Sequence, residues 1–153
     1  MAPVLDNLDR AILSTLQRDA TMSVDAISDA VHLSRNACWR RIKRMEDNGV
    51  IRGRVALLDP AMVGCPLTVM VLIRTHRHDT DWLDRFQSTL KSLPEVTGAA
   101  RLAGDLDYLL TVRVADVAAY DAFYKRLIDK VPVSDISASF VMEEIKATTA
   151  LPL

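Results

Sequence analysis

The sequence predicts an α+β chain in two parts, and three observations carry this prediction. Residues 5–48 place apolar residues at helical spacing, with short polar interruptions near 19–23 and 32–34. Residues 67–145 alternate between β-rich and helical patterns in the order β-α-β-β-α-β. Turn-forming residues at 59–66 separate the two patterns. We therefore expect a helical domain at 1–54, a linker strand at 55–66 and a second domain at 67–153.

Composition and charge narrow the class of protein. Half of the 153 residues are hydrophobic, which is enough for a substantial core and argues against disorder. The formal net charge of −1 argues against indiscriminate binding to polyanions. The charge is nevertheless uneven, because five of the nine Lys and Arg residues before position 55 fall within residues 35–44. A local basic patch is therefore expected in the first part.

The same composition sets the expected compartment. Cys38 and Cys65 are the only cysteines, and their spacing fits neither a metal site nor a redox motif. No secretory leader is visible, and no apolar run approaches the roughly 20 residues that a membrane span needs. We expect a cytoplasmic protein that has no contact with a membrane.

Two short helices open the chain. Asp6 is expected to cap a helix that reaches residue 18, because its carboxylate can accept a hydrogen bond from a free amide of the first turn. The apolar stripe of this helix consists of Leu8, Ile12, Leu13 and Leu16. Ser23 is expected to cap a second helix that ends near Val31.

A basic helix is predicted at 34–48, with Ser34 as its N-cap and Gly49 as its exit. Its apolar stripe consists of Cys38, Ile42 and Met45. Around that stripe lie the cations Arg35, Arg40, Arg41, Lys43 and Arg44. Two short helices, a tight turn and a basic helix are the parts of a helix-turn-helix. Residues 50–58 are expected to form a small wing hairpin or a strand that leaves the domain.

The second part is predicted to be a ferredoxin-like sandwich. Strands are expected at 67–75, 96–103, 107–114 and 133–145, and helices at 79–93 and 116–131. The first strand is apolar on both faces, so the sheet needs cover on both faces. Helices can cover only one of them, and symmetric pairing of two subunits is expected to cover the other. The alternative is a monomer with an exposed apolar face, which is uncommon.

Six motifs give the chain a family resemblance. They are LDNLDRAILSTLQRDA (5–20), LSRNACWRRIKRMEDNGVI (33–51), ALLDP (56–60), LPEV (93–96), GDLDYLLTVRV (104–114) and VMEEIKATTALPL (141–153). In this order and spacing the chain resembles the Lrp/AsnC, or feast/famine, transcriptional regulators over nearly its whole length. Within them it looks most like the branch that controls cysteine detoxification. One departure is local: family members often carry Pro-Gly-Val where this chain has Pro132-Val133.

The basic helix is the candidate recognition helix. Arg35 and Asn36 are nearest its N-terminus and are expected to contact base edges, Arg35 at guanine and Asn36 at adenine. The side chains expected at phosphates are Arg40, Arg41, Lys43 and Arg44, with Ser23, Ser34 and their helix N-termini as further donors. Trp39 is expected to shield the helix flank or touch the DNA backbone. The alternative is an ordinary solvated basic face.

A glycine turn at 104–108 is the second candidate site. Such a turn lets the backbone approach a small ligand, and its carboxylates can bind an ammonium group. In the resembled family this loop lies between dimers and binds amino acids. The resemblance therefore implies an effector site at Gly104, Asp105, Asp107 and Tyr108, with Arg101, Leu102, Ala103, Ser137 and Ser139 as less certain members. The alternative is a simple hairpin turn formed by Asp.

The sequence shows little support for catalysis or for a metal. His76 and His78 point the same way at a strand end, but no third ligand is assignable. Glu143 and Glu144 would face opposite sides of a strand and so make poor acid and base partners. We expect no catalytic residue, no metal and no cofactor other than an amino-acid effector.

These observations predict a sequence-specific transcriptional regulator that binds double-stranded DNA. By resemblance, its effector is an amino acid, cysteine first and a leucine-like one second. Its subunits are expected to form a homodimer and a higher homo-oligomer such as an octamer. One alternative is an architectural protein that wraps DNA without an effector. Another is a ligand-binding module whose helical part docks onto protein.

Overall fold

The computed structural model describes residues 4–77 and 79–153, so that His78 lies outside the described residues. The chain divides into two compact units. The first unit extends to residue 57 and also contains the last eight residues, 146–153. The second unit comprises residues 58–145. The expected division set residues 55–66 apart as a linker and placed residues 146–153 in the second domain, whereas the two units meet between residues 57 and 58 and the tail belongs to the first unit.

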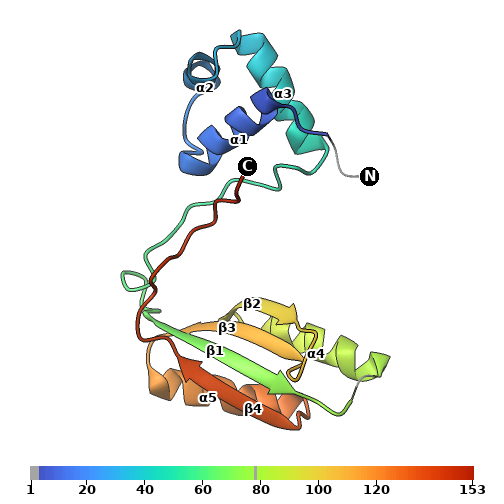
Figure 1. Ribbon diagram of the computed structural model, residues 1–153. Helices are drawn as coiled ribbons and strands as arrows, with labels where there is room; N and C mark the ends of the chain where they lie inside the picture. The colour runs from blue at the N-terminus through green and yellow to red at the C-terminus, as the bar shows by residue number, and fades with distance from the viewer. Residues whose placement is uncertain (1–3, 78) are drawn as a thin grey trace. The chain divides into compact units, whose positions relative to one another are not determined.

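The first unit contains the three predicted helices, α1 (Asn7–Arg18), α2 (Val24–Ala30) and α3 (Arg35–Asp47) (Figure 1). The predicted caps are confirmed. Asp6, Ser23 and Ser34 are the N-caps, and each side chain accepts a hydrogen bond from a backbone N–H of the first turn. Each helix therefore begins where a short polar side chain satisfies an otherwise free amide.

The three helices enclose one small apolar core. Its buried members are Ile12, Leu13, Ile27, Val31, Cys38, Ile42 and Met45, of which five belong to the stripes predicted for the first and third helices. Two backbone positions shape the connections. His32, between α2 and α3, has a φ of 55°, and Gly49, after α3, has a φ of 72°. Gly adopts this left-handed region without strain, whereas a residue with a Cβ is strained there. The tight turn between α2 and α3 therefore holds His32 in a strained backbone conformation.

A buried acid ties α3 to α1. Asp9 is 1% exposed, and its two carboxylate oxygens accept from two different guanidinium groups. Oδ1 lies 2.8 Å from Arg41 Nη1, and Oδ2 lies 2.7 Å from Arg44 Nη2. Asp9 also completes a capping box with Asp6 at the start of α1. We call Asp9, Arg41 and Arg44 the α1–α3 clamp.

The region after α3 differs from the prediction. Residues 52–58 form neither a hairpin nor a strand, and residues 60–64 form a turn, so the expected linker strand at 55–66 is absent from the structure. The C-terminal tail instead supplies an extended partner to the first unit. The Gln17 side-chain amide donates to the Leu151 carbonyl at 3.1 Å and accepts from the Leu151 N–H at 2.6 Å.

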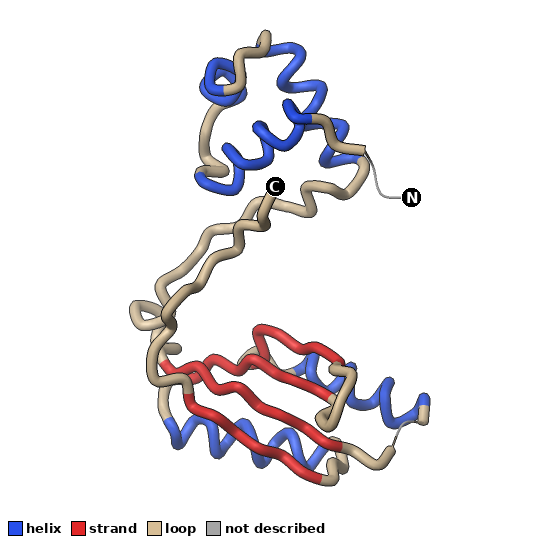
Figure 2. The backbone as a smooth tube through the Cα atoms, viewed as in Figure 1, coloured by secondary structure: helices blue, strands red, loops and turns tan. Residues whose placement is uncertain are grey.

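The second unit has the predicted β-α-β-β-α-β order (Figures 1 and 2). Its strands are β1 (Leu67–Arg74), β2 (Val96–Arg101), β3 (Tyr108–Val114) and β4 (Asp135–Phe140), and its helices are α4 (Thr80–Ser92) and α5 (Val117–Lys130). The sheet order is β2-β3-β1-β4, and every neighbouring pair is antiparallel. The predicted ferredoxin-like sandwich is confirmed.

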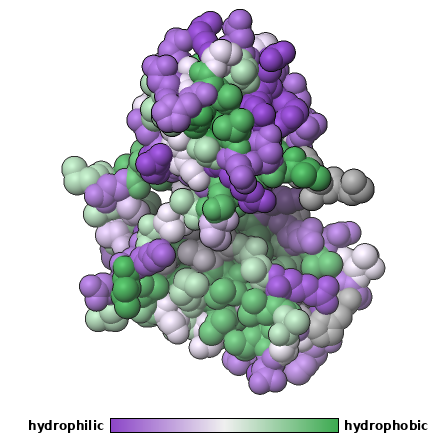
Figure 3. Space-filling view, turned by 45° about the horizontal axis from the view of Figure 1, so that its top comes forward, coloured by the Kyte–Doolittle hydropathy of each residue, from purple (hydrophilic) through white to green (hydrophobic). Residues whose placement is uncertain are grey.

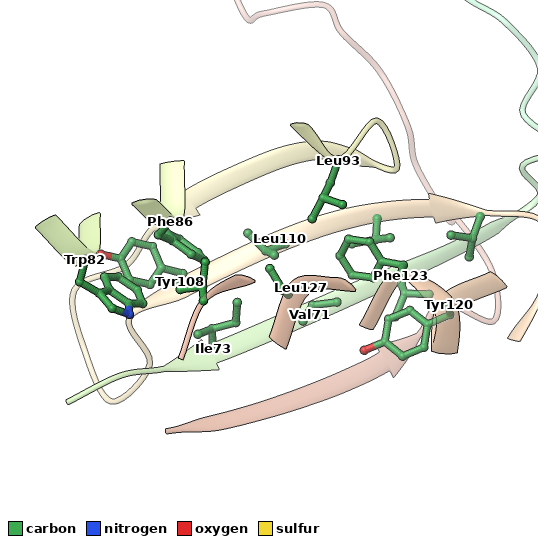
Figure 4. Packing of buried hydrophobic residues seen from close by; sticks show 14 residues of the cluster. Val71, Ile73, Trp82, Phe86, Leu93, Tyr108, Leu110, Tyr120, Phe123 and Leu127 are labelled. Atoms are coloured by element: carbon green, nitrogen blue, oxygen red, sulfur yellow. The ribbon is translucent and has the colours of Figure 1, made fainter. Parts of the chain in front are cut away.

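The core of this unit lies between the sheet and the two helices (Figure 4). Alternate residues of β1 and β3 point into it, among them Val71, Ile73 and Leu110, all fully buried. Phe123 and Leu127 of α5 are also fully buried there. An aromatic group of Trp82, Phe86 and Tyr108 fills one end. The Trp82 indole N–H donates to the Pro132 carbonyl at 2.7 Å.

The last strand is shorter than the predicted 133–145. Its partner β1 begins at Leu67, and the Val141 N–H donates to the Thr68 carbonyl in the last contact of the ladder. Beyond that point β1 offers no further backbone partner, so the chain leaves the sheet. Glu144 then accepts from the Arg113 guanidinium at 2.6 Å on the face away from the helices.

That second face of the sheet carries no helix (Figure 1). It presents half-buried apolar side chains, with Met70 and Leu72 from β1 and Leu109 from β3. Ser137 and Ser139 of β4 are opposite Leu72 and Met70. Hydrophobic residues gather on the surface of this unit in Figure 3. We call the face of the sheet opposite α4 and α5 the open face.

Among the described residues, no helix is long and apolar enough to cross a membrane.

The α1–α3 clamp predicts a stability effect. Asp9→Asn removes the charge that pairs both guanidinium groups and leaves Arg41, which is only a quarter exposed, without its buried partner. Removing one member of a fully buried ion pair costs about 3–5 kcal/mol, and the partial exposure of the arginines lowers our expectation to about 2 kcal/mol.

Urea unfolding followed by helical circular dichroism measures this loss. Asp29→Asn is the control, since Asp29 is exposed on α2 and its carboxylate has no ion pair among the described residues. Equal unfolding free energies for the two variants would show that the clamp contributes nothing.

Candidate nucleic-acid interface and ligand loop

Helix α3 has one buried face and one exposed face. Cys38, Ile42 and Met45 point into the core of the first unit. The exposed residues of α3 are Arg35, Asn36, Trp39, Arg40, Lys43, Arg44 and Asp47. Because the side chains three and four positions apart lie next to each other, Asn36, Arg40, Lys43 and Asp47 form the centre of this surface. The structure thus brings most of the predicted DNA-binding residues onto one face.

Ion pairs sort the cations of α3 into distinct groups. Arg41 is the least exposed of them and is held by both Asp6 and Asp9, at 2.7 and 2.8 Å. Arg44 gives one nitrogen to Asp9 but remains half exposed. Arg41 therefore acts within the protein, whereas Arg44 keeps donors that face solvent.

The other three cations are on the exposed surface. Arg35 pairs with Asp25 of α2 at 2.9 Å, and both side chains are about two-thirds exposed. Lys43 pairs with Asp47 one turn later at 2.8 Å. Exposed pairs of this kind contribute little to stability and are easily exchanged for another anion. Arg40 has no ion pair within residues 4–77 and 79–153, so its guanidinium is the most available.

The electrostatics of these groups follow from their contacts. The pKa of Asp6 lies below its usual range, first because the Asp9 N–H donates to it and second because Arg41 does. A hydrogen bond to Asp47 raises the pKa of Lys43, so that this ammonium group stays charged. Burial raises the pKa of the Cys38 thiol, which keeps it protonated. Cys38 is therefore a packing residue.

Two serines mark helix N-termini beside this surface. The Ser23 hydroxyl accepts from the Ala26 N–H at 3.1 Å, and the Ser34 hydroxyl accepts from the Ala37 N–H at 3.3 Å. Both serines are exposed, and each hydroxyl keeps its own proton for donation. The partial positive charge of a helix N-terminus also favours an anion at these positions.

The exposed surface of α3 is shallowly hollowed in two places. One hollow is lined by Trp39, Arg40, Lys43, Arg44, Asp47 and Asn48. The other lies between the end of α3 and the chain that follows it, and is lined by Lys43, Glu46, Asp47, Ile51, Arg52, Gly53 and Arg54. Both are open, and cations line each of them. Such surfaces suit an extended polyanion better than an enclosed small molecule.

The second candidate site is the loop at 102–107, between β2 and β3. Gly104 has a φ of 146°, which favours glycine. The Leu102 N–H donates to the Asp107 carbonyl at 2.8 Å and closes the loop. Arg74, at the end of β1, donates through Nε to the Asp105 carbonyl at 3.0 Å. The loop is therefore held at both its base and its tip.

Two predicted ligand residues support this loop from within. The Asp107 carboxylate accepts from the Thr75 N–H at 2.8 Å, and the Asp107 N–H donates to the Ile73 carbonyl at 3.0 Å. Tyr108 is buried against Phe86, with ring centroids 4.7 Å apart. In this structure both residues hold the loop on the sheet, rather than pointing out of it.

The remaining predicted ligand residues are at the surface. Arg101, Ala103, Gly104 and Asp105 are exposed, and Leu102 is half-buried. Ser137 and Ser139 are exposed on β4 and are separated from β3 by β1, so they are further along the open face. The structure thus joins the loop residues at one end of the sheet and leaves the two serines apart.

No group of three or more His, Cys, Asp or Glu side chains suited to a metal ion occurs in residues 4–77 and 79–153. His76 donates its backbone N–H to the Ser134 hydroxyl at 2.9 Å. His78, the second member of the pair considered from sequence, is outside the described residues.

Sequence reasoning missed the residues that hold each site in place. Asp9 lies on the buried face of α1 with Ile12 and Leu13, but the stripe predicted from the apolar residues of this helix does not include it. An acid at a core position is a signal for a buried ion pair. Arg74 and Thr75 carry no such signal, because their partners in the loop are 31 and 32 residues away.

Comparison with known protein families matches both units. Residues 5–52 match the model of winged helix-turn-helix DNA-binding domains, and residues 68–151 match that of the Lrp/AsnC ligand binding domain. The chain is 50% identical to the DNA-binding transcriptional activator DecR of Escherichia coli K12 over 151 residues, 98% of this chain and 99% of that protein.

Solved structures agree over the same length. An AsnC family transcriptional regulator from Agrobacterium tumefaciens is 53% identical, with a TM-score of 0.94 over 97% of each chain. A transcriptional regulator from Neisseria meningitidis, solved as a complex with L-methionine, is 35% identical, with a TM-score of 0.92 over 97% of each chain. The chain therefore belongs to the Lrp/AsnC family of transcriptional regulators.

Proposed function

We propose that the exposed face of α3 enters the major groove of double-stranded DNA and that the loop at 102–107 binds an amino acid that changes this binding. The observation that carries the proposal is a capped helix whose apolar face is fully packed while its other face offers cations and an amide to a polyanion. A recognition helix needs this division.

Within this proposal the side chains of α3 have different tasks. Arg35 and Asn36, in the first turn, contact base edges. Arg40 and Lys43 contact phosphates, and Ser23 and Ser34 donate to phosphates at the helix N-termini. Arg41 positions α3 through Asp6 and Asp9, and Arg44 joins that clamp while keeping donors for a phosphate.

The effector is proposed to be a small α-amino acid at the tip of the 102–107 loop. The Asp105 carboxylate is exposed and can accept the ammonium group, and Arg101 can pair with the carboxylate. Asp107 and Tyr108 are proposed to keep the loop in shape, as their contacts with Thr75 and Phe86 support. Cysteine is the first effector to test, and leucine and methionine follow.

A second copy of the chain is the proposed cover of the open face. Its half-buried apolar side chains need a partner, and a symmetric sheet-to-sheet pair buries the same residues of both copies. A dimer also presents two α3 helices, which matches the two half-sites of a palindromic operator. Ligand binding then changes operator affinity by favouring one arrangement of subunits over another.

The salt dependence of DNA binding tests the role of Arg40. Arg40→Ala should weaken binding to every duplex and lower the slope of log K against log salt by about 0.9 for each phosphate that the variant no longer neutralises. Fluorescence anisotropy across a series of KCl concentrations measures the slope. Arg85→Ala removes an exposed arginine of α4 and should leave it unchanged. Identical slopes for wild-type protein and Arg40→Ala would contradict the phosphate contact.

Sequence discrimination tests Arg35 and Asn36. Each alanine variant should lose about 1–3 kcal/mol of discrimination against the wrong base at one operator position, because alanine cannot form the bidentate hydrogen bonds. The measurement compares the affinity for a selected duplex with that for duplexes changed at single positions. Arg40→Ala serves as the comparison, since it should weaken all duplexes alike. Uniform losses from all three variants would refute this division of roles.

Thermal unfolding with each of the twenty amino acids tests the effector site. An effector at about a hundredfold excess over its Kd should raise the melting temperature by about 5 °C or more, by mass action. Asp105→Asn should abolish the shift, whereas Asp84→Asn, an exposed change on α4, should preserve it. DNA binding without any amino-acid response would favour the architectural alternative.

A further inference from the structure

We propose that Trp39 is a specificity-determining residue that reads the 5-methyl group of thymine. The proposal rests on the proposed function, because it assigns a base preference to a helix that enters the major groove. Its chemistry is distinct from that of Arg35 and Asn36, which read bases by hydrogen bonds. Trp39 adds an apolar contact to the same surface.

The first observation is the exposure of the Trp39 side chain. It is 56% exposed, while the other large apolar side chains of α3, Ile42 and Met45, are at most 4% exposed. The second tryptophan, Trp82, is 2% exposed and donates its indole N–H to the Pro132 carbonyl. Trp82 is therefore part of the core of the second unit, whereas Trp39 is exposed on the surface of the basic helix.

The second observation is that Trp39 has no partner within the described parts of the chain. Its ring is in no stacked, tilted or edge contact with another ring, and its indole N–H donates to no acceptor there. Its neighbours one turn away, Arg35 and Lys43, are instead paired with Asp25 and Asp47. An indole with an apolar face and an unused donor is typical of an interface residue.

The third observation is where Trp39 lies on α3. It is three residues after Asn36 and four before Lys43, so these side chains are adjacent on the helix surface. It lines the same shallow hollow as Arg40 and Lys43. Trp39 is also in the N-terminal half of α3, which is the half that approaches base edges in helix-turn-helix complexes.

The chemistry of the major groove selects one base feature for such a side chain. Guanine, cytosine and adenine present donors and acceptors there, and only thymine presents a methyl group. An indole face can bury this methyl group, whereas the single indole N–H cannot match the paired donor and acceptor groups of an adenine edge. Asn36 beside it suits adenine, the base that pairs with thymine. Together the two side chains would favour A·T pairs at adjacent operator positions.

Binding measurements in which one protein side chain and one DNA methyl group are removed, separately and together, test the proposal. The probe is a duplex selected from a random-sequence library on the wild-type protein, with single thymines replaced by deoxyuridine, which removes only the methyl group. Wild-type protein should lose about fourfold in affinity at one or two symmetric positions per half-site, the effect of one buried methyl group. Trp39→Ala should bind the parent duplex more weakly and should not distinguish thymine from uracil there.

Two controls keep the outcome specific. Deoxyuridine at positions outside the two half-sites should leave the affinity of the wild-type protein unchanged. Arg40→Ala should lose overall affinity but still distinguish thymine from uracil. An unchanged thermal melt of Trp39→Ala shows that the exposed substitution leaves the fold intact. Equal discrimination by wild-type and Trp39→Ala would overturn the proposal, as would wild-type indifference to every uracil. No binding to any selected duplex would instead overturn the proposed function itself.

Discussion

The pairing of Asp9 with Arg41 and Arg44 is the interaction on which the proposed DNA-binding surface depends. A helix as basic as α3 has to bury one face against α1, and the charges nearest that face need a partner inside the protein. Asp9 supplies it, because its two oxygens bind two guanidinium groups at 2.8 and 2.7 Å. The same carboxylate completes the capping box of α1. One acid thus supports the N-cap of α1 and holds α3 against this helix.

The clamp also limits how much of the positive charge acts outside the protein. Arg41 is held inside, and Lys43 and Arg35 share their charge with Asp47 and Asp25. The net positive charge of this surface is therefore small, in keeping with a formal net charge of −1 for the chain. Because non-specific affinity grows with the number of phosphates neutralised, this restraint favours contacts that depend on base identity. An exposed indole beside Asn36 fits a surface of this kind.

The fold followed from local sequence signals to a large extent. Asp6, Ser23 and Ser34 are the N-caps of α1, α2 and α3, as predicted from short polar side chains ahead of apolar stripes. The shape of each site could not be predicted from these signals, because it depends on contacts between residues that are far apart in the sequence. Asp107 and Tyr108 are ligand residues by resemblance, yet Asp107 binds the Thr75 backbone and Tyr108 packs on Phe86. Spacing reveals neither partner, since both contacts join elements that are distant in the sequence.

The loop at 102–107, the proposed ligand site, illustrates how this topology connects a surface turn with the core. Residues 102–107 are bound to the end of β1 through Arg74 and Thr75, and β1 is the strand that pairs with both β3 and β4. The Ser134 N–H donates to the Arg74 carbonyl, so the start of β4 meets the same strand end. A ligand that moved the loop would therefore act on one of the two central strands of the open face. Because packed sheets shift between discrete arrangements rather than deforming continuously, such a displacement would favour one mode of pairing over another in the proposed sheet-to-sheet dimer.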